Sequence, residues 1–213
     1  MDNHKFIEQL IERYPKLVIC REDILKAYNI LESAYSGGRK LLVAGNGGSA
    51  SDSEHIVGEL MKEFRLKRKI YADQVDAMKQ IDAEMGEVLA NNLQGALPAI
   101  CLTGHSSLST AFMNDANADL IFAQQVNGYG KTNDVYLGIS TSGNSKNVCY
   151  AAITAKAKGM KVIGLTGQNS SKLSALADVC IQVPEKETYK IQELHLPIYH
   201  CLCLMLENHF FGK

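Results

Sequence analysis

Short apolar runs, separated by polar loops and segments with helical periodicity, constrain the fold of this chain most strongly. Five such runs are present, at residues 40–44, 99–103, 135–139, 161–165 and 179–183. Each has the length and near-continuous apolar character of a strand that is buried on both faces of a parallel sheet. Residues 50–64 and 147–158, which lie between runs, have helical spacing. The sequence therefore predicts an α/β fold, a three-layer sandwich with a mainly parallel sheet of about five strands.

Helices outside this core are expected to belong to the same single domain, residues 1–213. Residues 1–36 should form N-terminal helices with a break at Pro15, because apolar residues recur at helical spacing on both sides of it. Residues 69–96 are interpreted as a helical insertion with an apolar stripe, which consists of Val75, Met78, Met85, Val88 and Leu89. The insertion either packs near a subunit boundary and helps to shape the binding cleft, or packs only on its own subunit.

The charge balance and the cysteines argue against several classes of protein. The 22 basic and 23 acidic residues are interspersed and give a net charge of −1, so no broad field favours nucleic acid or an anionic membrane. The six cysteines lack the spacing of a zinc finger or a disulfide framework and are expected to be reduced core residues. No signal core and no run of membrane-spanning length is present, so we expect a cytoplasmic location.

Two polar loops follow predicted strands and have the composition of anion-binding sites. Residues 45–50, with the sequence GNGGSA, place glycine-exposed amides at the start of a helix. They do not form the dinucleotide fingerprint, because no acidic residue follows at the usual distance on a second strand. Residues 140–145, with the sequence STSGNS, offer hydroxyls and amides to a phosphate dianion. The alternative for both loops is a structural turn with an ordinary helix cap.

Polar residues on two predicted helices are candidates for proton transfer. His55 and Glu59 lie four residues apart on one face of the helix after the first loop. Gln192 and His200 interrupt an apolar helix, where buried polar groups require partners, and Pro197 between them should kink that helix. The other histidines are expected to be satisfied or solvent-facing imidazoles: His4, His105, His195 and His209.

In their order along the chain, these motifs resemble the phosphoheptose isomerases, a family of sugar isomerase (SIS) domain proteins. The motifs are GNGGSA followed by His55-x-x-x-Glu59, GISTSGNS at 138–145, GMKVIGLTG at 159–167, and Ile191-Gln192-Glu193 with His200. The resemblance covers nearly the whole chain except residues 69–96. It implies a SIS fold of the flavodoxin-like type and a homotetramer. It also implies an enzyme that converts sedoheptulose 7-phosphate into D-glycero-D-manno-heptose 7-phosphate for lipopolysaccharide or other surface heptoses.

The resemblance also implies roles for individual residues. Glu59 and His200 would be the catalytic proton-transfer pair, because isomerisation removes a carbon-bound proton and returns it to the neighbouring carbon through an enediol. The substrate would be held by Asn46, Gly47, Gly48, Ser49, Glu59, Asn114, Asp115, Ser140, Thr141, Ser142, Ser145 and Gln192. One zinc ion binds in some members at positions that match His55, Glu59, Gln192 and His200. Zinc would polarise the carbonyl, although a metal-bound Glu59 would be a poorer base.

Two other functions fit the same fold. A non-catalytic SIS module, which binds a replication initiator protein or senses a sugar phosphate, would need no acid–base pair. An isomerase of a hexose or pentose phosphate would use the same chemistry on another sugar. The presence of His55, Glu59, Gln192 and His200 together favours an enzyme over the non-catalytic module.

Overall fold

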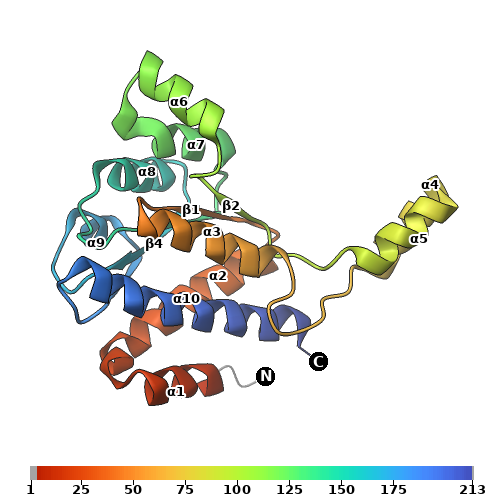
Figure 1. Ribbon diagram of the computed structural model, residues 1–213, viewed down its shortest axis with the longest axis horizontal. Helices are drawn as coiled ribbons and strands as arrows, with labels where there is room; N and C mark the ends of the chain where they lie inside the picture. Colours follow the sequence, from red (N-terminus) through yellow and green to blue (C-terminus); the bar gives the residue numbers. More distant parts are fainter. Residues whose placement is uncertain (1–3, 213) are drawn as a thin grey trace.

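A parallel sheet forms the centre of the molecule in the computed structural model, which describes the backbone of residues 4–212 and the side chains of residues 5–212 (Figure 1). The sheet has five strands in the order β2-β1-β3-β4-β5, and all neighbours run parallel. The strands are β1 (Leu41–Ala44), β2 (Ala99–Cys101), β3 (Val135–Ile139), β4 (Lys161–Thr166) and β5 (Val179–Gln182). The predicted three-layer α/β architecture is therefore confirmed.

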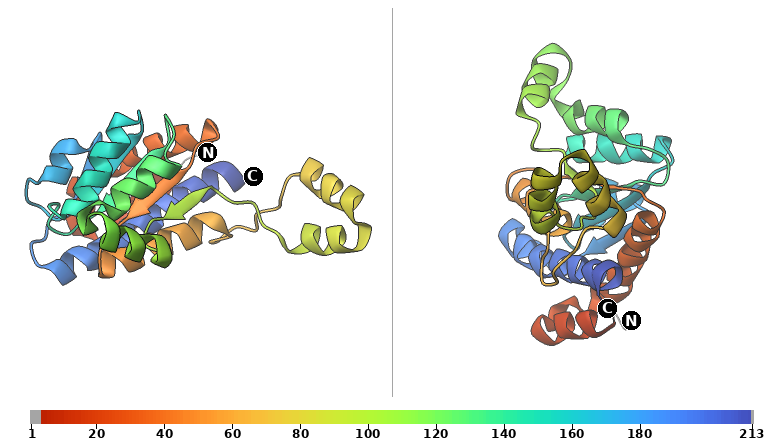
Figure 2. Two further views of the ribbon diagram at one scale, coloured as in Figure 1. Left: turned by 90° about the horizontal axis from the view of Figure 1, so that it is seen from above. Right: turned by 90° about the vertical axis from the view of Figure 1, so that its right-hand side faces the viewer.

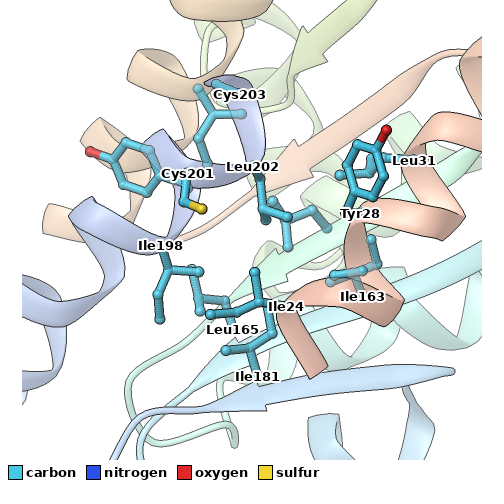
Figure 3. Packing of buried hydrophobic residues seen from close by; sticks show 14 of the residues in the cluster. Ile24, Tyr28, Leu31, Ile163, Leu165, Ile181, Ile198, Cys201, Leu202 and Cys203 are labelled. Carbon is cyan, nitrogen blue, oxygen red and sulfur yellow. The ribbon is translucent and has the colours of Figure 1, made fainter. Parts of the chain in front are cut away.

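Each strand contributes alternate side chains to two apolar layers. Leu41 and Val43 belong to the layer that includes α1 (His4–Arg13), α2 (Arg21–Ser36), α3 (Gly48–Met61) and α10 (Thr188–Phe211). Leu42 and Ala44 point to the opposite layer, which includes α7 (Ile121–Tyr129), α8 (Lys146–Ala157) and α9 (Lys172–Leu176). Figure 3 shows the first layer, where side chains from α2, β4, β5 and α10 meet. This two-sided burial explains why the strands read as continuous apolar runs.

The N-terminal helices pack on the core of their own chain. A 3₁₀ helix, η1 (Pro15–Cys20), begins at Pro15 and separates α1 from α2, as the sequence predicts. Proline suits this first helical position because its missing N–H would have no partner there. Phe6, Ile7 and Leu10 are buried, and α1 contacts α10. Helix α10 continues through Pro197, whose side chain is itself buried.

Two helices, α4 (Ala72–Ile81) and α5 (Ala83–Asn92), form a hairpin that we call the arm, and it projects away from the rest of the molecule (Figure 2). The two helices cross closely at Gly86, where a Cβ atom would lie 2.5 Å from the carbonyl oxygen of Met78. Gly86 is the only buried residue in either helix. Apolar side chains of the arm therefore face solvent in the isolated chain, Ile81 with 86% and Met85 with 64% of its surface exposed.

The remaining helical elements lie on the side of the sheet that α7 and α8 cover. They are α6 (Ser106–Asp115) and η2 (Ala118–Leu120), and α6 lies beyond α7 and α8 at the edge of the molecule (Figure 1). All six cysteines are free, as expected. Four of them are buried and so have the expected role of core residues: Cys20, Cys149, Cys201 and Cys203. None of the helices in the described part of the chain is long and apolar enough to cross a membrane.

Candidate active site

The two polar loops lie side by side at the carboxyl edge of the sheet, as expected for loops that follow neighbouring parallel strands. The side-chain amides of Asn46 and Asn147 donate to each other over 2.9 Å in both directions, and this reciprocal pair joins the loop after β1 to the start of α8. Gly47 has a φ of 56°, which favours glycine. Gly47 therefore allows the bend of the first loop, and the pair of asparagines joins that loop to the start of α8.

The serine-rich loop after β3 folds into a compact turn. The hydroxyls of Ser140 and Ser145 lie 3.0 Å apart, and Ser142 Oγ accepts a hydrogen bond of 3.2 Å from the amide of Asn144. Gly143 has a φ of 65°, and a Cβ atom there would lie 2.0 Å from Ser171 Oγ, so only glycine fits. These hydroxyls and the N-terminus of α8 face one region, which suits a dianion.

A cavity of about 350 Å³ adjoins this serine-rich loop. Thr141 and Ser142 line one side, and the cation of Lys186 and the amide of Gln168 come from the loops after β5 and β4. Glu185 also lines the cavity, but its charge is compensated by Lys16, whose Nζ atom lies 2.6 Å from its carboxylate. The sequence analysis did not single out Lys186 or Gln168. Their signal was their position after strands, on the edge where ligands of such folds bind.

Helices α3 and α10 lie side by side and bring the predicted acid–base residues together. Nε2 of His55 lies 3.2 Å from Oε1 of Glu59 and 3.5 Å from Nε2 of His200. The other oxygen of Glu59 is buried and has no hydrogen-bond partner among the described residues, and Nζ of Lys62 lies 3.7 Å from it. His55 is thus the common neighbour of the two proposed catalytic groups.

Two residues that the sequence analysis missed hold His55 from behind. The hydroxyl of Tyr199 lies 3.0 Å from Nδ1 of His55 and donates to Oδ1 of Asp52 over 3.2 Å. Asp52 is one helical turn before His55, and Tyr199 precedes His200, so each was adjacent to a predicted residue in helical or chain position. Their connection depends on how α3 meets α10, which no local pattern reveals.

Burial shapes the protonation of these groups. It lowers the pKa of His200, and the neighbouring His55 lowers it further, against the opposing effect of Glu59. Burial raises the pKa of Asp52, while the hydrogen bond from Tyr199 and the proximity of His55 oppose that change. Burial and the nearby carboxylate of Asp52 also raise the pKa of Tyr199. At neutral pH the His200 imidazole is therefore neutral and able to accept a proton, and the Tyr199 hydroxyl keeps its hydrogen.

Among the described residues, no recorded contact joins Gln192, or the pair Asn114 and Asp115, to the histidines. Gln192 lies against Gly48, where an added Cβ atom would be 2.6 Å from its Nε2 atom. It therefore faces the glycine-rich loop, two turns of α10 before His200. Asn114 donates to Asp115 over 2.8 Å at the exposed end of α6. Within residues 4–212, no recorded contact joins this pair to the other predicted site residues.

The donor atoms around His55 fit zinc in type and in two of their separations. Tetrahedral zinc takes imidazole nitrogen and carboxylate oxygen, and its bond lengths place neighbouring donors about 3.3–3.5 Å apart. The separations of 3.2 Å to Glu59 and 3.5 Å to His200 are close to these values. However, no three His, Cys, Asp or Glu side chains of the described residues are already grouped as a metal site. The fit to zinc therefore rests on two pairs of donor atoms, His55 with Glu59 and His55 with His200.

A buried ion pair anchors the end of α3 that carries Glu59. Glu207 accepts from the backbone amides of Phe64 and Arg65, each over 2.8 Å, and from Nε of Arg68 over 2.9 Å. Arg68 in turn donates to the carbonyl oxygens of Leu60 over 2.7 Å and of Glu59 over 2.9 Å. The contacts of Glu207 tie the segment after α3 to α10, and those of Arg68 tie it back to the end of α3, so the pair supports the position of the Glu59 backbone.

His195 differs from the expectation of a satisfied or solvent-facing imidazole. It is fully buried, and neither ring nitrogen has a hydrogen-bond partner among the described residues. The backbone of Thr166 approaches the ring without completing a hydrogen bond, and burial prevails, lowering the pKa of His195 to about 4. His195 is buried because α10 packs on the sheet. The sequence analysis did not consider this packing when it predicted the environment of the ring. The side chain of His4 lies outside the described residues.

Comparisons with known proteins agree with this geometry. The SIS domain family matches residues 77–167. Phosphoheptose isomerase of Aneurinibacillus thermoaerophilus is 38% identical over 177 residues, 83% of this chain and 76% of that protein. That of Sulfurimonas denitrificans is 34% identical over 206 residues, 97% of this chain and 91% of that protein.

Two solved structures extend the similarity to three dimensions. Phosphoheptose isomerase from Francisella tularensis superposes with a TM-score of 0.75 at 30% identity and covers 96% of both chains. That from Neisseria gonorrhoeae gives a TM-score of 0.72 at 30% identity, covering 97% of this chain and 94% of that one. The chain therefore belongs to the phosphoheptose isomerase family of SIS domain proteins.

Proposed function

We infer that the protein is an aldose–ketose isomerase that converts sedoheptulose 7-phosphate into D-glycero-D-manno-heptose 7-phosphate. One observation carries this conclusion in a chain of this family: the carboxylate of Glu59 and the imidazole of His200 meet across His55, beside two loops suited to a sugar phosphate. A non-catalytic binding module would need no such acid–base pair, so the arrangement favours an enzyme over a sensor.

Glu59 and His200 would divide the proton transfers between them. Glu59 would remove a proton from C1 of the ketose and return it to C2, with an enediol between the two steps. His200, which is neutral at neutral pH because its pKa is lowered, would take the proton from the C1 hydroxyl as the aldehyde forms and give it to the C2 oxygen. The proton removed from carbon is returned to carbon, so no external reagent is needed.

The serine-rich loop would hold the phosphate. The support is the cluster of Ser140, Thr141, Ser142 and Ser145 at the N-terminus of α8, whose amides and dipole favour an anion. Asn46, Gly47, Gly48, Ser49 and Gln192 would contact the sugar, since Gln192 lies against the glycine-rich loop. Asn114 and Asp115 would also contact the substrate, and the support for them is only their match to the Asn-Asp motif of the family.

One zinc ion per site is part of the proposal. His55, Glu59 and His200 would hold it, with Gln192 as a further ligand by resemblance, and the two short separations around His55 support this set. Bound zinc would supply a Lewis acid that polarises the substrate carbonyl. The imidazoles of His55 and His200 and the carboxylate of Glu59 would be the ligands that this set supplies.

We further propose a single SIS domain that works in the cytoplasm as a homotetramer and supplies the synthesis of lipopolysaccharide or other surface heptoses. The exposed apolar side chains of the arm support the existence of subunit contacts, because a hydrophobic surface of this kind is unfavourable in water. Light scattering of the purified protein would measure the mass. A monomer at working concentration would contradict the tetramer.

Incubation with a panel of seven-, six- and five-carbon ketose phosphates, followed by NMR, tests the proposed reaction. We expect aldose signals from sedoheptulose 7-phosphate and, in D2O, deuterium at C2, because the proton passes through a base that exchanges with solvent. Glu59→Gln is the control, and it should abolish both signals. Binding without conversion would identify a sensor instead, and conversion of only the shorter sugars would identify another isomerase.

A further inference from the structure

Asp52, Tyr199 and His55 form a hydrogen-bonded chain behind the proposed catalytic groups. Tyr199 is almost fully buried, and its hydroxyl contacts Asp52 Oδ1 at 3.2 Å and His55 Nδ1 at 3.0 Å. The second oxygen of Asp52 is buried and has no hydrogen-bond partner within the described residues. The hydroxyl of Tyr199 is therefore the only recorded hydrogen-bond donor to this carboxylate.

The number of hydrogens in the chain decides its direction. A tyrosine hydroxyl has one hydrogen to donate, and a carboxylate only accepts. When Tyr199 donates to Asp52, its oxygen can take part in the second contact only as an acceptor. Nδ1 of His55 must then be the donor, so a neutral His55 has its proton on Nδ1 and a lone pair on Nε2.

The opposite direction would be less favourable. If Tyr199 donated to His55, Asp52 would have no recorded donor, and leaving a buried charged group without its hydrogen bond is unfavourable. Nε2 of His55 would then donate to Glu59, whose other oxygen also lacks a hydrogen bond among the described residues, but Glu59 has the cation of Lys62 3.7 Å away, whereas no ion pair is recorded for Asp52. The more isolated carboxylate, Asp52, therefore takes the hydrogen.

We propose that Tyr199, anchored by Asp52, is a positioning residue that fixes the tautomer of His55 and directs the Nε2 lone pair toward Glu59 and His200. Two consequences follow for the site. Without a bound cation, the N–H of His200 Nε2 can donate to His55 across 3.5 Å. The lone pair of His55 and the nearby oxygen of Glu59 also form an electron-rich corner, which a donating substrate hydroxyl or a cation would occupy.

The role of the His55 tautomer in catalysis rests on the proposed isomerase function. The tautomer itself can be measured without any turnover. Solid-state 15N NMR of histidine-labelled protein, at about pH 8.5 to keep imidazoles neutral, distinguishes protonated from unprotonated ring nitrogens. The His55 signals are assigned by their loss in His55→Gln. We expect the wild type to have a protonated Nδ1 and an unprotonated Nε2.

Two substitutions should change this pattern and one should not. Tyr199→Phe removes the acceptor for Nδ1–H, so the population should shift toward the Nε2–H tautomer. Asp52→Leu frees the tyrosine hydrogen to donate to Nδ1, which should produce the same shift with the tyrosine still present. Tyr136→Phe is the matched control, because it also removes one buried hydroxyl, which donates to the carbonyl of Val148 over 3.2 Å on the other side of the sheet.

Kinetics separate positioning from general damage to the fold. Tyr199→Phe should lower kcat by roughly 10- to 100-fold, as loss of a supporting partner of a functional histidine does, and leave KM nearly unchanged. Tyr136→Phe should keep the wild-type kcat. A wild-type His55 protonated on Nε2, or a Tyr199→Phe enzyme that keeps both tautomer and kcat, would overturn the proposal. Absence of isomerase activity in a wild type with the expected tautomer would instead refute the proposed function.

Discussion

Glu59 extends from the last turn of α3, and the reaction should depend on its carboxylate more than on any other group. Glu59→Gln keeps the volume but removes the base, so we expect kcat to fall by about two to four orders of magnitude while substrate binding stays measurable. Glu54→Gln, an exposed carboxylate of the same helix, is the matched control and should retain activity. Near-normal turnover of Glu59→Gln would reject Glu59 as the base.

The hydroxyls of the serine-rich loop give a second prediction at the scale of single residues. Ser142→Ala and Ser145→Ala each remove a hydroxyl from the proposed phosphate site, and a hydrogen bond to a charged group contributes about 1.5–3 kcal/mol. We therefore expect roughly tenfold or greater weakening for the phosphorylated sugar, and little change for its dephosphorylated analogue, by calorimetry. Ser107→Ala, on the exposed face of α6, is the control. Equal losses for both ligands would indicate a folding defect.

Helical spacing alone was enough to pair His55 with Glu59, because the i,i+4 relation places both on one face. It could not pair Asp52 with Tyr199, since that contact depends on the register between α3 and α10. It also could not place Gln192 against Gly48. Local patterns thus predict groups on one helix, whereas contacts between helices depend on packing that a single sequence does not reveal.

Among the elements, the end of α3 depends on the buried pair of Arg68 and Glu207. Removing one partner leaves a buried charge without compensation, which typically costs about 3–5 kcal/mol. Glu207→Gln should therefore lower the free energy of unfolding by about that amount in a denaturant titration. Arg21→Gln, which breaks the exposed pair with Glu8, should cost less than about 1 kcal/mol. A cost for Glu207→Gln no larger than that of this control would contradict the anchoring role.

His195 lies between α10 and β4 and should make stability depend on pH. Burial lowers its folded-state pKa to about 4 from 6.5, so between these values the unfolded chain binds a proton that the folded chain does not. The stability from the neutral ring is complete above about pH 6.5 and is lost as the pH falls toward 4, by roughly 3 kcal/mol. His195→Leu should weaken this dependence in unfolding measurements. An identical pH profile in the variant would refute the assignment.

The periodic patterns predicted the strands and the helical insertion, but not the point at which the insertion divides into two helices. The five strands follow from their apolar runs, because both faces of the sheet are covered. Residues 69–96 are helical as predicted, and they divide into two helices because Asp82 caps the second by accepting a hydrogen bond of 2.8 Å from the amide of Met85. This aspartate was the local signal for the division, and its position inside an apparently continuous stripe concealed it.

At the scale of the whole molecule, the arm should matter for assembly. Residues 71–94 can be replaced by a short Gly/Ser linker, because the amide of Gly95 donates to the carbonyl of Arg68 over 2.9 Å and holds the two ends together. We expect a lower mass by light scattering and an increased KM for the sugar phosphate, since the exposed apolar stripe is lost from the subunit contacts. Asp76→Ser on the intact arm is the control. Unchanged mass with unchanged kinetics would reject a role in assembly and in the cleft.

The path of the chain through the site also has a consequence for its synthesis. His55 and Glu59 are made early, and all five strands are complete by Gln182, but their partner helix α10 begins only at Thr188. A chain interrupted on the ribosome before that point would leave exposed the part of this apolar layer that α10 covers, and would also lack His200. Catalytic competence and protection from proteases and chaperones would thus arise together, when the chain has emerged through Phe211.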